Sequence, residues 1–323
     1  MTRTYLAVDL GGTNSRYGLV NQNGEVLRRG RFPIHSYRGP EPIIEDLIVH
    51  LRSFLDALSS GQRPRALVVG AAGLIRAEDG VLVAAPNLPG WKNIPLADIL
   101  GQALSLEVRL ENDANLYALG EWFAGAGRHL SHLIVVTLGT GVGGGLILNG
   151  RLWNGSFLSA GEIGHVIVEP EGRPCGCGGR GCLETVASAT AITRTAREWI
   201  MAGQPCAFSG HPDDLTSRDL YGLARQGDAL ARRVFDRAGW ALGLALTNVF
   251  NILGLQGAVI GGGVSAAYDF IRPSMFEEFS TRVFAVDPNR IRLAPAALGD
   301  DAPLAGVPVL FQKSGDPQAH GAT

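Results

Sequence analysis

A segment that occurs twice in the chain constrains the fold more than any other feature. Residues 6–20, LAVDLGGTNSRYGLV, align without gaps with residues 134–148, IVVTLGTGVGGGLIL. Each copy contains an apolar run, Leu-Gly, a short loop and a second apolar run, and a turn follows (NQNG and NGR). Two interpretations remain open: a chance match between short apolar runs, or a duplicated fold whose halves face each other.

The apolar pattern around the repeat predicts an α/β chain. Apolar residues recur at helical spacing from Ile43 to Leu58, after two prolines, and predict a helix. A long proline-free helix is expected at about 228–253, and the polar tail from about residue 314 is expected to fray. Short apolar runs predict buried strands at 66–73, 107–113 and 257–261, the last leading through three glycines into a helix.

Length and composition narrow the class of protein. A chain of 323 residues favours two domains, and 46% hydrophobic with 18% charged residues is typical of a globular protein. The net charge of -2 provides no basic field for nucleic acid or an anionic membrane surface, so neither is expected as a partner. With no secretory signal at the amino terminus, no membrane-length apolar run and only four cysteines, we expect a cytoplasmic protein.

Two familiar nucleotide-binding motifs are excluded. Lys92 and Lys313 are the only lysines, and neither follows the glycine pattern of a P-loop or of a protein kinase. Gly139, Gly141 and Gly144 satisfy GxGxxG, but this loop leads into an apolar run and an Asn-Gly turn. Because a dinucleotide fingerprint must open a helix, we interpret the segment as a hairpin and reject a Rossmann dehydrogenase.

Three glycine-rich loops predict phosphate binding by another device. Glycines let backbone N–H groups approach a phosphate, and a single such loop would otherwise be a tight turn. Asp9 precedes the first loop and is predicted to hold Mg²⁺ through water; alternatively, it caps the N–H groups of that loop. The loops lie at Gly11–Asn14, Gly139–Gly145 and Gly261–Gly263.

A cysteine cluster predicts a structural zinc site. Cys175, Cys177 and Cys182 lie in CGCGGRGC, and His165 precedes the first of them by ten residues. Three thiolates and one imidazole fill all four positions of a tetrahedral zinc ion, which leaves no open position for activating water. The alternatives are a disulfide with one thiol left over, or a loop that is merely rich in glycine. Cys206 lies outside the cluster.

Polar residues at strand ends and near the cysteines predict a site for hydroxyl chemistry. Asn112 and Asp113 end a predicted strand, Glu162 and His165 lie in AGEIGH, and Glu184 follows the last cysteine of the cluster. A carboxylate beside a sugar hydroxyl can accept its proton, while other carboxylates and amides bind the remaining hydroxyls. Each carboxylate alone could instead be a solvated surface group, and Asp113 could be the N-cap of the following helix.

These motifs together resemble one family. DLGGTNSR, ENDAN, TLGTGVGGG, AGEIGH, CGCGGRGCLE and VIGGGVS occur in an order and spacing similar to the ROK family of repressors, uncharacterised reading frames and sugar kinases. The resemblance implies an actin/hexokinase-like (ribonuclease H-like) duplicated α/β fold with two domains and an intervening cleft. The implied domains are a small one of residues 1–114 plus a carboxyl-terminal helix at about 302–313, and a large one of residues 115–301 with the zinc loop at 165–184.

The resemblance also implies roles for individual residues. Asp113 matches the catalytic base, and His165 would serve both zinc and sugar. The sugar-binding positions matched are Gly73, Asn87, Asn112, Asp113, Glu162, His165 and Glu184. The nucleotide-binding positions matched are Asp9, Gly11, Gly12, Thr13, Gly139, Thr140, Gly141, Gly262 and Gly263, and the metal ligands are His165, Cys175, Cys177 and Cys182.

The implied activity is transfer of the γ-phosphoryl group of ATP to a hexose, with Mg²⁺ and a structural Zn²⁺. APNLPGWKNIPL and SAGEIGH are most similar to the glucokinase branch, and N-acetylglucosamine or N-acetylmannosamine kinase is the alternative. A sugar-sensing regulator is the alternative from another class, but only eight residues precede Asp9, where family repressors carry a DNA-binding domain. A homo-oligomer, dimer or tetramer, is expected from the family.

Overall fold

The computed structural model describes residues 3–85, 88–284 and 286–312. Contacts divide the chain into two compact units, each formed from separate stretches of sequence. The first unit comprises residues 1–129, 154–159 and 300–323, and the second comprises 130–153 and 160–299. This division differs from the expected boundary after residue 114, because helix α3 (Asp113–Phe123) packs on α9 (Ala302–Gly306) and stays with the first unit.

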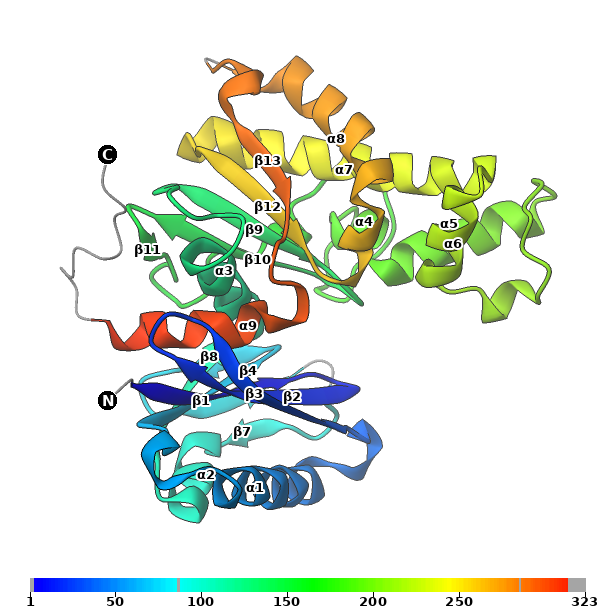
Figure 1. Ribbon diagram of the computed structural model, residues 1–323. Coiled ribbons are helices and arrows are strands. Elements are labelled where there is room, and N and C mark those ends of the chain that lie inside the picture. Colours follow the sequence, from blue (N-terminus) through cyan, green and yellow to red (C-terminus); the bar gives the residue numbers. More distant parts are fainter. Residues whose placement is uncertain (1–2, 86–87, 285, 313–323) are drawn as a thin grey trace. The chain divides into compact units, whose positions relative to one another are not determined.

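The first unit is built on a five-stranded sheet (Figure 1). Strands β1, β2 and β3 form an antiparallel meander, and β4 and β8 extend the sheet parallel to β1. The order across the sheet is β3-β2-β1-β4-β8. The strands are β1 (Thr4–Leu10), β2 (Asn14–Asn21), β3 (Val26–Pro33), β4 (Ala66–Ala71) and β8 (Glu107–Asn112).

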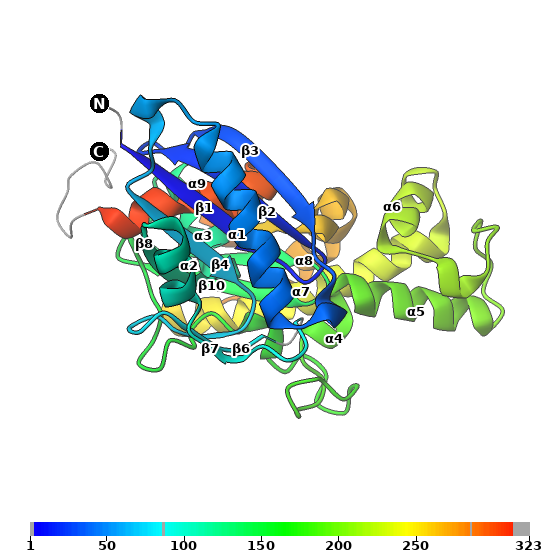
Figure 2. The ribbon, with the colours of Figure 1, turned by 90° about the horizontal axis from the view of Figure 1, so that it is seen from below.

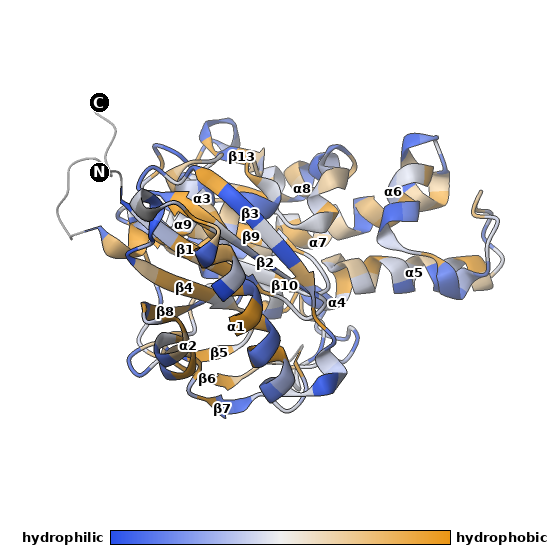
Figure 3. Cartoon of the chain, turned by 60° about the horizontal axis from the view of Figure 1, so that its bottom comes forward, coloured by the Kyte–Doolittle hydropathy of each residue, from blue (hydrophilic) through white to orange (hydrophobic). Residues whose placement is uncertain are grey.

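Helices cover both faces of this sheet. Leu6, Val8 and Leu10 alternate along β1 and join the core formed with α1 (Pro40–Asp56) and α2 (Leu96–Leu104), which Figure 2 shows over one face. On the other face α9 contacts β1 and β2, and α3 contacts β4 and β8. The central strands are therefore almost continuously apolar, whereas edge strand β3 is more hydrophilic (Figure 3).

A second, smaller sheet follows β4. Strands β5 (Leu74–Arg76), β6 (Val81–Ala84) and β7 (Lys92–Ile94) form an antiparallel meander. The three strands come from the sequence between the two parallel strands β4 and β8. None of them was expected from the sequence pattern, because each is short and only partly buried.

The second unit repeats the first sheet. Its strands run in the order β11-β10-β9-β12-β13, with an antiparallel meander followed by two parallel strands, as in the first unit. The repeat at 6–20 and 134–148 therefore reflects a duplicated sheet, and chance similarity is the wrong interpretation. The strands are β9 (Leu133–Leu138), β10 (Val142–Leu148), β11 (Arg151–Leu152), β12 (Gly257–Gly261) and β13 (Arg292–Pro295).

The predicted long helix forms the centre of the second unit. Helix α7 (Ala229–Leu253) begins after Asp228, whose carboxylate accepts the Ala231 N–H at 2.8 Å, and it packs along α8 (Tyr268–Arg282). A Cβ at Gly239 would lie 2.2 Å from the Ile271 carbonyl oxygen, so glycine permits the close approach of the two helices. Three further helices complete the unit: α4 (Glu184–Ala187), α5 (Ala189–Met201) and α6 (Ser217–Arg225).

No helix in the described ranges combines the length and the apolar character needed to cross a bilayer.

Candidate functional site

The predicted base lies at the junction of β8 and α3. Asn112 is the N-cap of α3, because its Oδ1 accepts the N–H groups of Ala114 (2.9 Å) and Asn115 (3.2 Å). Asp113 is the first residue of the helix and is half-buried, so the alternative in which Asp113 is the N-cap is wrong. The junction follows the carboxyl end of the parallel strands β4 and β8, where α/β proteins place polar site residues.

A polar network surrounds this junction. The Asn115 Nδ2 donates to Glu111 Oε1 at 2.9 Å and to Asn154 Oδ1 at 3.2 Å, and the Asn112 N–H donates to the same Glu111 oxygen at 3.0 Å. Burial raises the pKa of Glu111 above the ordinary value for a glutamate, against the opposing effect of these hydrogen bonds. Glu111, Asn115 and Asn154 were not among the predicted site residues.

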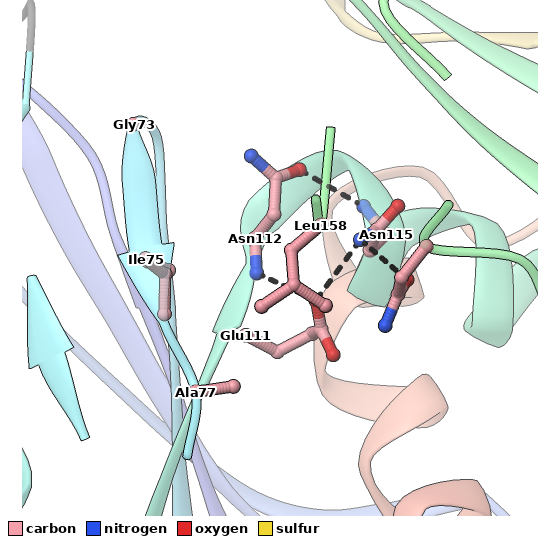
Figure 4. A pocket seen from close by; sticks show the side chains of 8 residues that line it. Gly73, Ile75, Ala77, Glu111, Asn112, Asn115 and Leu158 are labelled. Carbon is pink, nitrogen blue, oxygen red and sulfur yellow. Dashed lines mark hydrogen bonds between the residues drawn. The ribbon is translucent and has the colours of Figure 1, made fainter. Parts of the chain in front are cut away.

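The network borders an open depression, which Figure 4 shows. Ile75 and Ala77 line one side, and Leu158 lies beside the polar side chains of the network (Figure 4). Gly73, a predicted sugar contact, lines the same depression at φ +141°, where a Cβ would lie 2.1 Å from the Ala84 carbonyl oxygen. Predicted residue Asn87 lies outside the described residues.

The first glycine loop joins β1 to β2, and an ion pair between Asp9 and Arg16 lies next to this loop. Leu10 pairs with Ser15, so the loop is four residues long, and the Gly11 N–H donates to the Asn14 carbonyl at 3.2 Å. Asp9 lies opposite Arg16 in the ladder, and Asp9 Oδ2 is 3.2 Å from Arg16 Nη1. Burial raises the pKa of Asp9, and the Arg16 guanidinium opposes this shift.

Asp9 does not cap its loop within the described part of the chain. Its carboxylate contacts Arg16, and its backbone carbonyl accepts the Ser15 hydroxyl at 3.3 Å. Among the described residues, the Asp9 carboxylate therefore accepts no N–H group of its loop, as the capping alternative would require. The second Arg16 amino group lies 3.2 Å from Asp300 Oδ2, so one guanidinium bridges two carboxylates.

The second and third glycine loops lie side by side in the second unit. The second joins β9 to β10, with the Gly139 N–H donating to the Gly141 carbonyl at 2.9 Å. The third follows β12, where Gly262 has φ +80° and a Cβ would lie 2.5 Å from the Leu138 carbonyl oxygen. Glycine at 262 therefore permits the two loops to approach each other, and Thr140 and Gly263 lie on them.

The third glycine of the GxGxxG pattern serves packing. Gly144 lies within strand β10, and a Cβ there would be 2.5 Å from the Gly161 carbonyl oxygen. Gly164 is pressed against β10 in the same way, since a Cβ at this position would lie 2.1 Å from the Val142 carbonyl oxygen. The hairpin interpretation is confirmed, and the AGEIGH segment lies on β10. Glu162 and His165 remain exposed on it.

The four predicted metal ligands lie together. The ligand atoms of His165, Cys175, Cys177 and Cys182 are all within 4.8 Å of one another. Cys177 Sγ is 3.7 Å from Cys182 Sγ, and Cys175 Sγ is 3.7 Å from His165 Nδ1. A disulfide would bring two sulfurs to about 2.05 Å. Tetrahedral zinc with bonds of about 2.3 Å to sulfur instead separates two sulfurs by about 3.8 Å.

The thiols titrate unequally. Burial, with further contributions from the neighbouring thiols of Cys175 and Cys177, raises the pKa of Cys182 to about 12. The Gly179 N–H donates to Cys177 Sγ at 3.4 Å and lowers the pKa of that exposed thiol. Because metals bind thiolates, a divalent cation at this cluster would release protons from it.

Glu184 connects the cysteine cluster with the second glycine loop. Its Oε2 accepts the Val142 N–H at 3.0 Å, and Cys175 Sγ lies 3.9 Å from its Oε1. A Cβ at Gly141 would lie 2.4 Å from Glu184 Oε2, so a larger residue there would displace this carboxylate. The predicted sugar ligand thus also has a structural role at the loop.

Comparison with known proteins gives matches over nearly the whole chain. The model of the ROK family matches residues 5–314. The chain is 35% identical over 311 residues to the glucokinase of Thermotoga maritima, covering 95% of this chain and 97% of that protein. It is 31% identical over 314 residues to the N-acetylmannosamine kinase of Shigella flexneri, covering 96% and 98% respectively.

A solved structure is similar in fold. The ROK family glucokinase from Streptomyces griseus, crystallised in complex with glucose and AMPPNP, superposes with a TM-score of 0.81. It is 31% identical in sequence, and the match covers 95% of this chain and 98% of that one.

Proposed function

Because this chain belongs to the ROK family and has the actin/hexokinase-like fold, we propose that it phosphorylates a hexose with ATP, glucose being the favoured substrate. The observation that carries the proposal is Asp113, a half-buried carboxylate at the start of α3 whose neighbour Asn112 fixes the helix start. The relatives of this chain include a glucokinase and an N-acetylmannosamine kinase, so the proposed acceptor is a hydroxyl group of a hexose.

The proposed reaction is an in-line transfer. The hexose oxygen forms a bond to the γ-phosphorus of ATP, the bond from that phosphorus to the β-phosphate oxygen breaks, and ADP leaves. The hydroxyl proton passes to Asp113. In the proposed assignment Asn112, Glu162, His165 and Glu184 bind other sugar hydroxyls, together with Gly73 and Asn87.

The proposed nucleotide-binding positions lie on the glycine loops, where the N–H groups of Gly11 and Gly139 donate within their own loops and the other N–H groups are the proposed phosphate donors. These positions include Gly11, Gly12 and Thr13 in the first unit, and loops 139–141 and 262–263 in the second. Exposed N–H groups stabilise phosphate oxygens without a lysine, which suits a chain whose only lysines lie elsewhere. Asp9 is the proposed magnesium ligand, acting through water.

The proposed zinc site is structural. The donor set and the separations of its atoms fit a tetrahedral Zn²⁺ held by His165, Cys175, Cys177 and Cys182. The bound ion would neutralise the thiolates and cross-link the loop that precedes Glu184. The thiols and the use of ATP both suit a reducing compartment, so we propose the cytoplasm. We also propose a homo-oligomer, dimer or tetramer, which sedimentation would measure, and no nucleic-acid partner.

A panel of sugars tests the proposed activity. ADP release is measured with ATP, Mg²⁺ and glucose, mannose, fructose, N-acetylglucosamine or N-acetylmannosamine. We expect glucose to give the highest kcat/KM. Highest turnover with an N-acetylated sugar would transfer the assignment to the alternative kinases. Sugar binding in calorimetry, with no ADP released for any sugar, would instead favour a sensor and contradict the proposed kinase.

Asp9→Asn tests the proposed magnesium role. The substitution keeps the shape of the side chain but removes the charge that attracts Mg²⁺. We expect kcat at saturating ATP to fall by about tenfold or more and the Mg²⁺ concentration for half-maximal rate to rise, since metal–phosphate charge stabilisation contributes several kcal/mol.

Asp300→Asn is the matched control for Asp9→Asn. It removes the other carboxylate that contacts Arg16, but the Asp300 side chain is 78% exposed. An exposed ion pair of this kind contributes little, so the Mg²⁺ dependence should match that of the wild type. Equal effects of the two substitutions would mean that Asp9 acts only by holding Arg16.

A further inference from the structure

Asn115 is a buried polar residue in the first turn of α3, close to the proposed base. Only 6% of its surface is exposed. Its side-chain nitrogen donates two hydrogen bonds, to Glu111 Oε1 at 2.9 Å and to Asn154 Oδ1 at 3.2 Å, as Figure 4 shows for the Glu111 contact. Both amide hydrogens are therefore used, and the two acceptors belong to chain segments far apart in sequence.

The first acceptor, Glu111, is the penultimate residue of β8. Glu111 Oε1 also accepts the Asn112 N–H, so Asn115 and the backbone of Asn112 share one carboxylate oxygen. A largely buried carboxylate without donors is costly, and removing one donor would leave that oxygen free to move toward water. Asn115 thus stabilises the turn that carries Asn112 and Asp113, because it and the Asn112 N–H donate to the same Glu111 oxygen.

The second acceptor, Asn154, lies in a short segment that is separated in sequence from the rest of the first unit. Residues 154–159 belong to that unit, although the chain before and after them belongs to the second. Asn154 is hydrogen-bonded to Asn115, and Leu158 lines the depression beside Asn112. The chain continues from Ser159 to Glu162, a proposed sugar ligand, within three residues.

We infer that Asn115 is a positioning residue, holding the Asn112–Asp113 turn and the segment 154–159 in a single hydrogen-bond network. The inference rests on the proposed function, since it concerns the turn that carries the proposed base. Asn115 lines the depression, but both hydrogens of its side-chain amide are used within the network. It acts by limiting the displacement of the proposed sugar-binding groups, and a misplacement of about 1 Å can cost about a hundredfold in rate.

Asn115→Ala tests the inference. It removes the donor to both acceptors, and we expect kcat/KM for the sugar to fall about 10- to 100-fold with both kcat and sugar KM affected, while KM for ATP stays within twofold. Asn115→Asp should be at least as damaging, because it faces the Glu111 carboxylate with another acceptor. Adding Glu111→Gln to that variant supplies a donor again and should recover at least tenfold of the loss.

Asn21→Ala is the control for general loss of stability. Asn21 is also 6% exposed and accepts N–H groups of Asn23 and Glu25, but it lies opposite Thr4, at the amino-terminal end of β1 and away from the carboxyl ends of β4 and β8. Its kinetic constants per folded molecule should match the wild type. If Asn115→Ala behaves like Asn21→Ala, or if Glu111→Gln gives no recovery, Asn115 has no positioning role.

Hydrogen exchange separates this inference from the proposed activity. In Asn115→Ala, backbone amides of residues 107–115 and 154–159 should exchange at least tenfold faster, with other segments unchanged. This readout needs no turnover, so a wild type without kinase activity would refute the proposed function and leave the network testable. Normal wild-type activity combined with unchanged exchange in both segments would refute the network alone.

Discussion

Asp113→Asn should reduce turnover by roughly 10²- to 10⁴-fold while the protein still binds its hexose. The amide has the size of the carboxylate but cannot accept the hydroxyl proton as the oxygen attacks phosphorus. Asn112 would still cap α3 through its own side chain, so the helix start should persist. Steady-state ADP release gives kcat, and calorimetric titration with the sugar gives the affinity.

Asp269→Asn is a matched control for that experiment. Asp269 is also an aspartate in the first turn of a helix, α8, and is exposed. Its replacement should leave kcat within twofold of the wild type. Substantial activity in Asp113→Asn would remove Asp113 from the role of base, whereas a loss of sugar affinity equal to the loss of kcat would make it a binding residue.

Cys182→Ser should abolish stoichiometric zinc binding and lower the unfolding midpoint. Cys182 is buried, and its sulfur lies 3.7 Å from that of Cys177, so one ligand is lost from the interior of the cluster. A ligand that binds only the folded chain stabilises it by about 4 kcal/mol when its free concentration is a thousand times its Kd. Elemental analysis measures the zinc, and urea titration with and without a chelator measures the stability.

The fourth cysteine provides the control. Cys206 lies outside the cluster, and Cys206→Ser should keep one zinc per chain and the wild-type response to chelator. In Cys182→Ser the chelator should have no further effect. One zinc per chain retained in Cys182→Ser would contradict the proposed ligand set, and an unchanged midpoint after zinc removal from the wild type would contradict its structural role.

The fold was largely predictable because its central strands are buried on both faces. Such strands are continuous apolar runs, which made β1, β4, β9 and β12 visible and revealed the duplication. The alignment missed one detail: Leu10 pairs with Ser15, but Leu138 pairs with Val142, so the second hairpin loop is one residue shorter.

The metal cluster was predictable for a different reason. Its four ligands lie within 18 consecutive residues, from His165 to Cys182, and thiol and imidazole ligands have few other uses in that combination. The chemistry of the ligands and their local spacing were sufficient, without knowledge of the fold.

Contacts that depend on tertiary structure could not be predicted in this way. The Asn115–Asn154 bond joins residues 39 positions apart, and no local pattern indicates it. Glu111 and Asn115 are four residues apart, but Glu111 lies in β8 and Asn115 in α3, so the rule for residues four apart on one helix does not indicate their contact either. The Asp9–Arg16 pair becomes predictable only when the loop length, and hence the register of β1 and β2, is known.

The chain passes between its two units four times, after residues 129, 153, 159 and 299. Helix α9, which packs on α3, β1 and β2, is therefore synthesised after the second unit although it belongs to the unit whose synthesis begins first. At about 5–20 residues per second on the ribosome, roughly ten seconds or more separate the synthesis of the first sheet from that of α9, which covers one of its faces. Completion of the amino-terminal half is thus a late event in biosynthesis, and no single cut in the sequence would separate the units.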